Sequence, residues 1–152
     1  MIKDSVKSIG TLDIVLTDEF GQIKEKMTVP NLVVQTGRNY ITHRMLSGAN
    51  AVMSHMAIGT GNAPPDLADT TLQVETFRNA LTAASVASPG NVASYVAIFD
   101  PGQPATANAI TEAAIFNASS AGEMLCRTTF PVINKGILDT LTITWSVKNS
   151  SN

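Results

Sequence analysis

The chain has 152 residues, of which 44% are hydrophobic and only 14% are charged, and its formal net charge is −2. This length predicts one globular domain with its own core, and ten basic against twelve acidic residues leave no basic stripe for nucleic acid. A single cysteine excludes an internal disulfide and a zinc site built from several cysteines. Because an average domain is about 25% charged, the low charge favours a chain whose surfaces meet other protein over a weakly solvated monomer.

The first ten residues lack the apolar stretch of a signal peptide. No run in the chain reaches the roughly 18 apolar residues that a membrane-spanning helix needs. We therefore expect a protein that is made in a reducing compartment and has no membrane partner.

The N-terminal segment is predicted to form a β-hairpin over residues 11–29. Apolar residues alternate with polar ones from Leu12 to Leu16, and the second strand alternates again after the turn. Gly21 ends the Asp-Glu-Phe-Gly turn and can adopt a positive φ. Pro30 is expected to end the second strand.

One helix is predicted, over residues 36–46 (Thr36 to Leu46). Thr36 is the expected N-terminal cap, and an apolar stripe that includes Tyr40 and Met45 has helical spacing. Gly48 is expected to stop the helix. Three turns of helix are long enough to lie across one sheet.

From Met53 onward, short β-rich segments alternate with turns rich in glycine and proline, including Pro89-Gly90 and Ser-Ser-Ala-Gly. Strands that recur every 8–12 residues predict an antiparallel β-sandwich. We expect a single domain over residues 1–152, mainly β, with the helix packed on the sandwich and a flexible C-terminal tail (148–152). The strands are expected at residues 53–58, 75–88, 91–100, 109–118, 123–132 and 139–147.

The Gly59-Thr60-Gly61 turn follows a predicted strand, as a dinucleotide-binding turn would. The third glycine of G-x-G-x-x-G is replaced by Pro64, Pro65 follows it, and neither a βαβ unit nor a P-loop lysine is present. The expected role is therefore structural. The two glycines supply positive φ angles, and the two prolines make a rigid connection.

The two histidines, His43 and His55, could lie near each other and form a metal site with Asp66 or Asp69. No H-x₃-H spacing supports such a site, so we expect no metal. The aspartates are expected to be solvated or capping, and Asp69 is the candidate cap of a short helical turn.

Other candidate reactive groups also favour structural roles. Cys126 could be a nucleophile whose pKa is lowered by Arg127, but a buried cysteine more often packs as a small hydrophobe. Glu112 interrupts an apolar strand and must be paired or exposed, with Arg78 or Arg127 as its expected partner. No G-x-S-x-G elbow is present, and 5% aromatic residues provide little to hold a sugar. We expect no enzymatic activity and no cofactor.

Four segments carry a resemblance to a known family: VPNLVVQTGRNYI, MSHMAIGTGNAPPDLADTTL, ITEAAIFNASSAGEMLCRTTFPVINKG and DTLTITWSV. Together they resemble short virion proteins of tailed bacteriophages and prophages, described as tail-fibre or related structural proteins. The likeness covers residues 12–147. Ala114 stands where glycine is expected in the T-E-A-G pattern.

The resemblance implies a non-enzymatic structural protein of the virion, made in the cytoplasm of a host bacterium. It would be a homo-oligomer, with a trimer as one form, bound to other virion proteins on the tail, neck or head. A capsid decoration protein is the alternative within this class. A receptor- or carbohydrate-binding module using residues 59–71 and 101–108, and a metal-dependent enzyme, are the other classes. The predicted interaction residues are Gly59, Thr60, Gly61, Asn62, Pro64, Pro65, Asp66 and Asp69.

Overall fold

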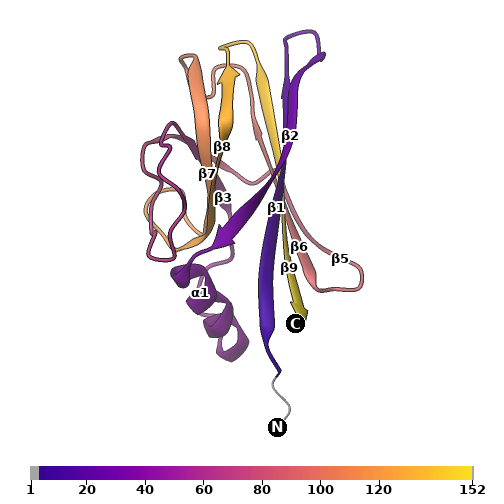
Figure 1. Cartoon of the computed structure of the whole chain (residues 1–152), viewed down its shortest axis with the longest axis vertical. Helices are drawn as coiled ribbons and strands as arrows, with labels where there is room; N and C mark the ends of the chain where they lie inside the picture. The colour runs from indigo at the N-terminus through magenta and orange to yellow at the C-terminus, as the bar shows by residue number, and fades with distance from the viewer. Residues whose placement is uncertain (1–3, 152) are drawn as a thin grey trace.

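Nine strands and one helix make up residues 4–151, the part of the chain that the computed structural model describes (Figure 1). Hydrogen-bonded neighbours follow the order β4-β3-β7-β8-β2-β1-β9-β6-β5, and every pairing is antiparallel. The sheet curls into two facing layers, which confirms the predicted β-sandwich with one helix. The elements are β1 (Val6–Thr17), β2 (Ile23–Val33), α1 (Gln35–Leu46), β3 (His55–Gly59), β4 (Glu75–Ala80), β5 (Ala83–Ala87), β6 (Val92–Phe99), β7 (Asn108–Phe116), β8 (Met124–Lys135) and β9 (Thr140–Ser151).

Strand β2 joins the two layers. Most of it pairs with β1, but its last two residues, Leu32 and Val33, pair with β8 instead. The prediction that Pro30 ends this strand is therefore wrong. Pro30 stands opposite Thr11 just before the change of partner, where the ladder with β1 is about to end.

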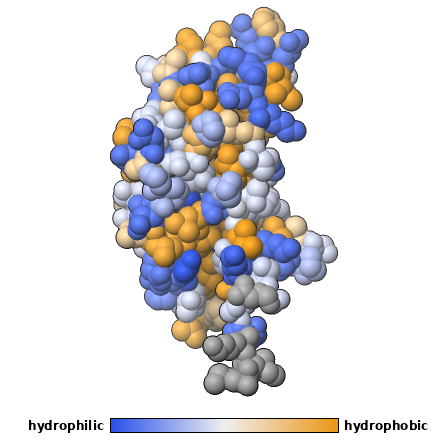
Figure 2. Space-filling model, viewed as in Figure 1, coloured by the Kyte–Doolittle hydropathy of each residue, from blue (hydrophilic) through white to orange (hydrophobic). Residues whose placement is uncertain are grey.

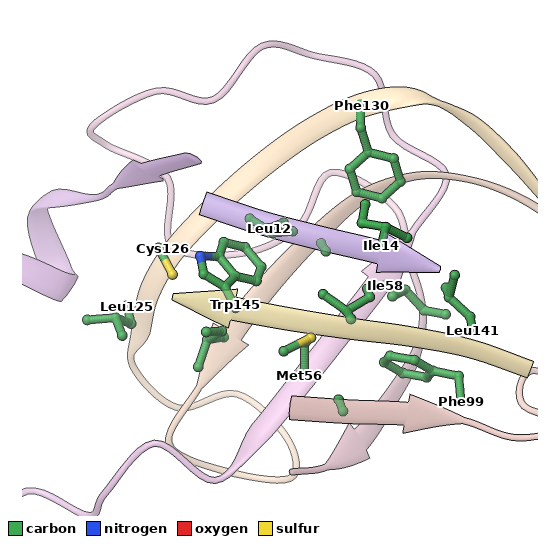
Figure 3. Packing of buried hydrophobic residues seen from close by; sticks show 14 of the residues in the cluster. Leu12, Ile14, Met56, Ile58, Phe99, Leu125, Cys126, Phe130, Leu141 and Trp145 are labelled. Carbon is green, nitrogen blue, oxygen red and sulfur yellow. The ribbon is translucent and has the colours of Figure 1, made fainter. Parts of the chain in front are cut away.

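The core lies between the layers and is built from inward-facing residues of every strand except β5 (Figure 3). The predicted alternation in the first and last strands is confirmed, because the inward residues of β1 and β9 are fully or almost fully buried. The predicted turns at Gly21 and Gly90 are confirmed as well, with φ angles of 79° and 103°. The inward residues of these two strands are Leu12, Ile14, Leu16, Leu141, Ile143, Trp145 and Val147.

Helix α1 lies beside β8, with only Gly37 and Tyr40 buried. Thr36 does not cap it, because Val34 occupies the cap position and the Thr36 hydroxyl donates to the carbonyl oxygen of Met124 at 2.9 Å. The apolar residues of the last turn, Met45 and Leu46, are 81% and 86% exposed. The helix is therefore fixed at its beginning and leaves an apolar end uncovered. No helix in the described residues is long and apolar enough to cross a membrane.

Two other predicted segments differ in the structure. Residues 75–88, predicted as one strand, form two strands, β4 and β5, at opposite ends of the sheet order. Between them Leu81 packs on the core, and its amide donates to the carbonyl of Ser54 at 2.8 Å. The C-terminal segment from Lys148 to Ser151 is the end of β9, paired with residues 6–9 of β1. The prediction of a flexible tail is therefore wrong for these four residues, and Asn152 lies outside the described residues.

Candidate interaction surfaces

The β3–β4 loop (residues 60–74) covers the outer face of the layer that contains β3, β7 and β8 (Figure 1). Under it lies a second apolar cluster, separate from the main core. All eight predicted interaction residues lie in this loop or, for Gly59, at its start. The cluster consists of Val34, Ala57, Leu72, Ala114, Phe116 and Met124.

Glu112 fixes the β3–β4 loop from below. Its side chain is fully buried on the outer face of β7, and its two oxygens accept three backbone hydrogen bonds from the loop. The amide of Gly61 donates at 3.0 Å, that of Gln73 at 3.0 Å and that of Val74 at 2.7 Å. One carboxylate therefore ties both ends of the loop to the sheet.

Arg127 is the partner of Glu112. Its guanidinium donates to Glu112 Oε2 at 2.8 Å through Nη2 and at 3.2 Å through Nε. Nη1 donates to Asp69 Oδ2 at 2.7 Å, and Nη2 also reaches the carbonyl oxygen of Ala63 at 3.0 Å. The arginine thus joins the sheet, the middle of the loop and the buried carboxylate in one ion network.

The ionised form of Glu112 is the one that the site stabilises. Burial alone would raise the pKa of this carboxyl, but the hydrogen bonds from Val74, Arg127, Gln73 and Gly61 hold the pKa below its ordinary value. For Arg127, burial acts to lower the pKa, and the bonds to Glu112 and Asp69 outweigh it and raise the pKa. Both groups therefore stay charged at neutral pH, and the two carboxylate oxygens of Glu112 are occupied by donors.

Acidification is expected to destabilise the fold through Glu112. A carboxyl whose pKa is lowered by folding stabilises the native state fully above its ordinary pKa of 4.5 and loses that contribution as the pH falls through the lower folded value. In urea unfolding at pH 6, 4.5 and 3, the urea concentration at the midpoint should fall as the pH is lowered. A midpoint that stays constant down to pH 3 would contradict this role.

Gly59 and Gly61 allow the loop to approach Glu112 closely. Neither has a positive φ, so the predicted conformational role is wrong. A Cβ on Gly59 would overlap the carbonyl oxygen of Val74 and lie 2.7 Å from Glu112 Oε1, and a Cβ on Gly61 would lie 2.5 Å from the same oxygen. Only the absence of a side chain lets the backbone pass over the buried carboxylate.

The remaining loop residues form a partly to fully exposed surface whose backbone is held by further hydrogen bonds. Asp69 caps no helix, because residues 66–69 form a turn in which the Asp66 carboxylate accepts from the amide of Ala68 at 2.8 Å. Asp69 instead accepts from Arg127 and from the amide of Asp66. Gln73, which no sequence pattern singled out, accepts through Oε1 from the amides of Asn62 and Ala63 at 2.8 and 2.9 Å. Thr60 is bound through its amide to the Val74 carbonyl, and the backbone passes through Pro64 and Pro65.

Arg78 is not a partner of Glu112. It forms a bidentate pair with Glu75 on the same strand, at 2.9 and 2.8 Å. Its guanidinium also lies 3.7 Å from the ring centre of Phe116 and donates to the carbonyls of Ala118 and Ala121. Arg78 therefore holds the β7–β8 turn onto β4.

The other candidate reactive residues, His43, His55 and Cys126, lie on three different elements. His43 is exposed on α1, while His55 begins β3 and shares a 2.8 Å hydrogen bond with Ser54. Within residues 4–151, no three His, Cys, Asp or Glu side chains lie together in a metal-binding arrangement. Cys126 is fully buried, and burial raises the pKa of its thiol well above the ordinary value.

An open hollow of about 380 Å³ lies at the end of the molecule where β1 meets β2 and β8 meets β9. Exposed Phe20, Ile137 and Leu138 line it together with Lys24 and Asp139, which form an ion pair of 2.7 Å. The predicted binding loop at residues 101–108 reaches this end, since the amide of Gly102 donates to the carbonyl of Ile137. No hydrogen bond within the described residues links it directly to the β3–β4 loop.

The second exposed surface is the β5–β6 hairpin, called the arm (residues 82–96). It projects at the right of Figure 1 and Figure 2, and every residue from 82 to 90 is exposed. No charged residue occurs between Arg78 and Asp100. This gap in charge is visible in the sequence, although the low overall charge alone did not point to this segment.

Comparisons of this chain with protein-family models, with curated proteins and with solved structures found no match.

Proposed function

We propose that this chain is a non-enzymatic structural protein of a tailed-bacteriophage particle, of the short tail-fibre type, which works as a homo-oligomer. The single observation that carries the assembly role is the arm. This hairpin has no charged residue, its residues 82–90 are all exposed, and its strand β5 forms an open edge of the sheet. The placement in a phage particle comes from the sequence resemblance over residues 12–147. The activity of the chain is self-association and contact with other virion proteins, and the chain is located in the finished particle.

The surface chemistry of the arm suits burial against protein. Interface cores are depleted of charged residues, whereas the exposed surface of a monomer usually carries them densely. Val86, next to the central residue of β5, is 70% exposed, and its neighbours in the strand are serine and alanine. Small uncharged side chains permit close approach of a second backbone, and a particle that uses many identical copies benefits from one such repeated contact.

The polar groups inside the protein support a structural role. The carboxylate of Glu112 already accepts from three backbone amides and from Arg127, so it presents no free oxygen to a substrate. The network holds the β3–β4 loop in one shape. A rigid loop surface is what a protein needs when its neighbours must recognise it in every copy.

Quantitative mass spectrometry of gradient-purified phage particles from the source of this sequence tests the proposal. We expect the chain in intact particles at tens of copies, which is the number for tail fibres. Hundreds of copies would replace the fibre role by capsid decoration. Absence from washed, infectious particles, with known capsid proteins detected as a control, would overturn the virion proposal altogether.

A further inference from the structure

Strand β5 ends one side of the sheet without any of the usual protection. It pairs only with β6, and no strand lies beyond it in the described residues. Natural proteins shield such edges with charged residues, proline, bulges or a covering loop. The five residues of β5 contain no charge and no proline, their register with β6 is unbroken, and all five are exposed.

We propose that two copies of this chain pair through β5, antiparallel and around a two-fold axis at Ser85, so that their two sheets become one. This inference rests on the proposed function and gives it a defined contact. The backbone groups on the outer edge of β5 would hydrogen-bond to those of the partner strand, as in β-strand addition. All other contacts of the monomer would remain as they are.

The sequence of β5 fits itself under a two-fold axis. With Ser85 opposite Ser85 of the partner, Ala83 stands opposite Ala87 and Ala84 opposite Val86. Each pair joins small, uncharged side chains, so neither a steric clash nor like charges oppose the contact. This register also pairs all five residues of both strands, and a shifted register would pair fewer.

The other sheet edge is a poorer partner, which favours the two-fold arrangement over a head-to-tail ring. Strand β4 carries Glu75 and Arg78, whose ion pair would have to be accommodated at the contact. Its Asn79 side chain already donates to the carbonyl of Ile98 on β6 at 2.8 Å. β4 is thus bound to β6, the neighbour of the opposite edge strand, while β5 projects away from the body (Figure 1).

Opposite charges at Ser85 test the pairing. Ser85→Lys and Ser85→Glu each place like charges face to face and should weaken self-association about tenfold or more. Mixing the two variants should restore it, because Lys then faces Glu. Ser85 is exposed, so the melting temperature of each variant should match that of the wild type at low concentration. Ser120→Lys, in the exposed turn between β7 and β8, is the matched control, with unchanged association.

A Ser85→Cys variant adds a geometric test. Residues directly opposite each other in an antiparallel pair have Cα atoms about 4.5–5.5 Å apart, which is within the range of a disulfide. Mild oxidation should give a covalent dimer on a non-reducing gel, whereas the wild type, with only buried Cys126, should not.

The outcomes separate this inference from the proposed function. Self-association that survives Ser85→Lys, or a trimer in solution, would overturn the β5 pairing and leave assembly through another surface. A wild-type chain that stays monomeric at every concentration would overturn both the pairing and the homo-oligomeric role.

Discussion

Replacing Glu112 by glutamine should lower the free energy of unfolding by about 3–5 kcal/mol, the usual cost of breaking a buried ion pair. The site offers only donors to this position, namely three backbone amides and the Arg127 guanidinium. The amide nitrogen of glutamine would face one of them, and Arg127 would keep only Asp69 as its charged partner. The β3–β4 loop should then separate from the sheet before the rest of the protein unfolds.

The matched control is Glu75→Gln, the same substitution in the ion pair with Arg78. Because the Glu75 side chain is partly exposed, this change should cost less than about 1 kcal/mol. Thermal unfolding of both variants measures the difference, and Glu112→Gln should lower the melting temperature by roughly 10 °C or more. Equal effects of the two substitutions would show that the buried network does not stabilise the loop.

Replacing Gly59 by alanine should cost about 1–3 kcal/mol, as overpacking of a tight contact does. The new Cβ would meet the carbonyl oxygen of Val74 and Oε1 of Glu112, and neither can retreat without losing its own hydrogen bonds. Hydrogen exchange should therefore report faster exchange of the amides of Gly61, Gln73 and Val74, which bind that carboxylate.

Gly48→Ala provides the comparison for this substitution. A Cβ at Gly48 would meet nothing closer than Arg44 Nη1 at 4.0 Å, so the free energy of unfolding should hardly change. If Gly59→Ala cost as little stability as Gly48→Ala, the close approach of the backbone to Glu112 would not be the reason for glycine at position 59.

The fold was predictable in segments where every second residue is apolar, because this alternation marks the buried face of a strand. Leu12 to Leu16 in β1 and Leu141 to Trp145 in β9 show this alternation, and both are core strands. The residues from Lys148 to Ser151 have no such pattern, and they become a strand only because residues 6–9 of β1 lie beside them. Pairing between segments that are far apart in sequence leaves no local signal in the polar partner.

The buried network was only partly predictable for the same reason. That Glu112 needs a partner follows from its place in an apolar strand, and Arg127 was one of two candidates. Asp69, 58 residues before Arg127, is brought in only by the folded loop. The reason for glycine at positions 59 and 61 was out of reach, because it depends on a carboxylate that lies 51 residues after Gly61.

Sedimentation equilibrium of the purified full chain tests most directly whether this protein is a self-assembling module. We predict that the average mass rises from 16.0 kDa toward twice that value as the concentration increases from the micromolar to the millimolar range. A mass that remains at 16.0 kDa throughout would contradict the homo-oligomeric role.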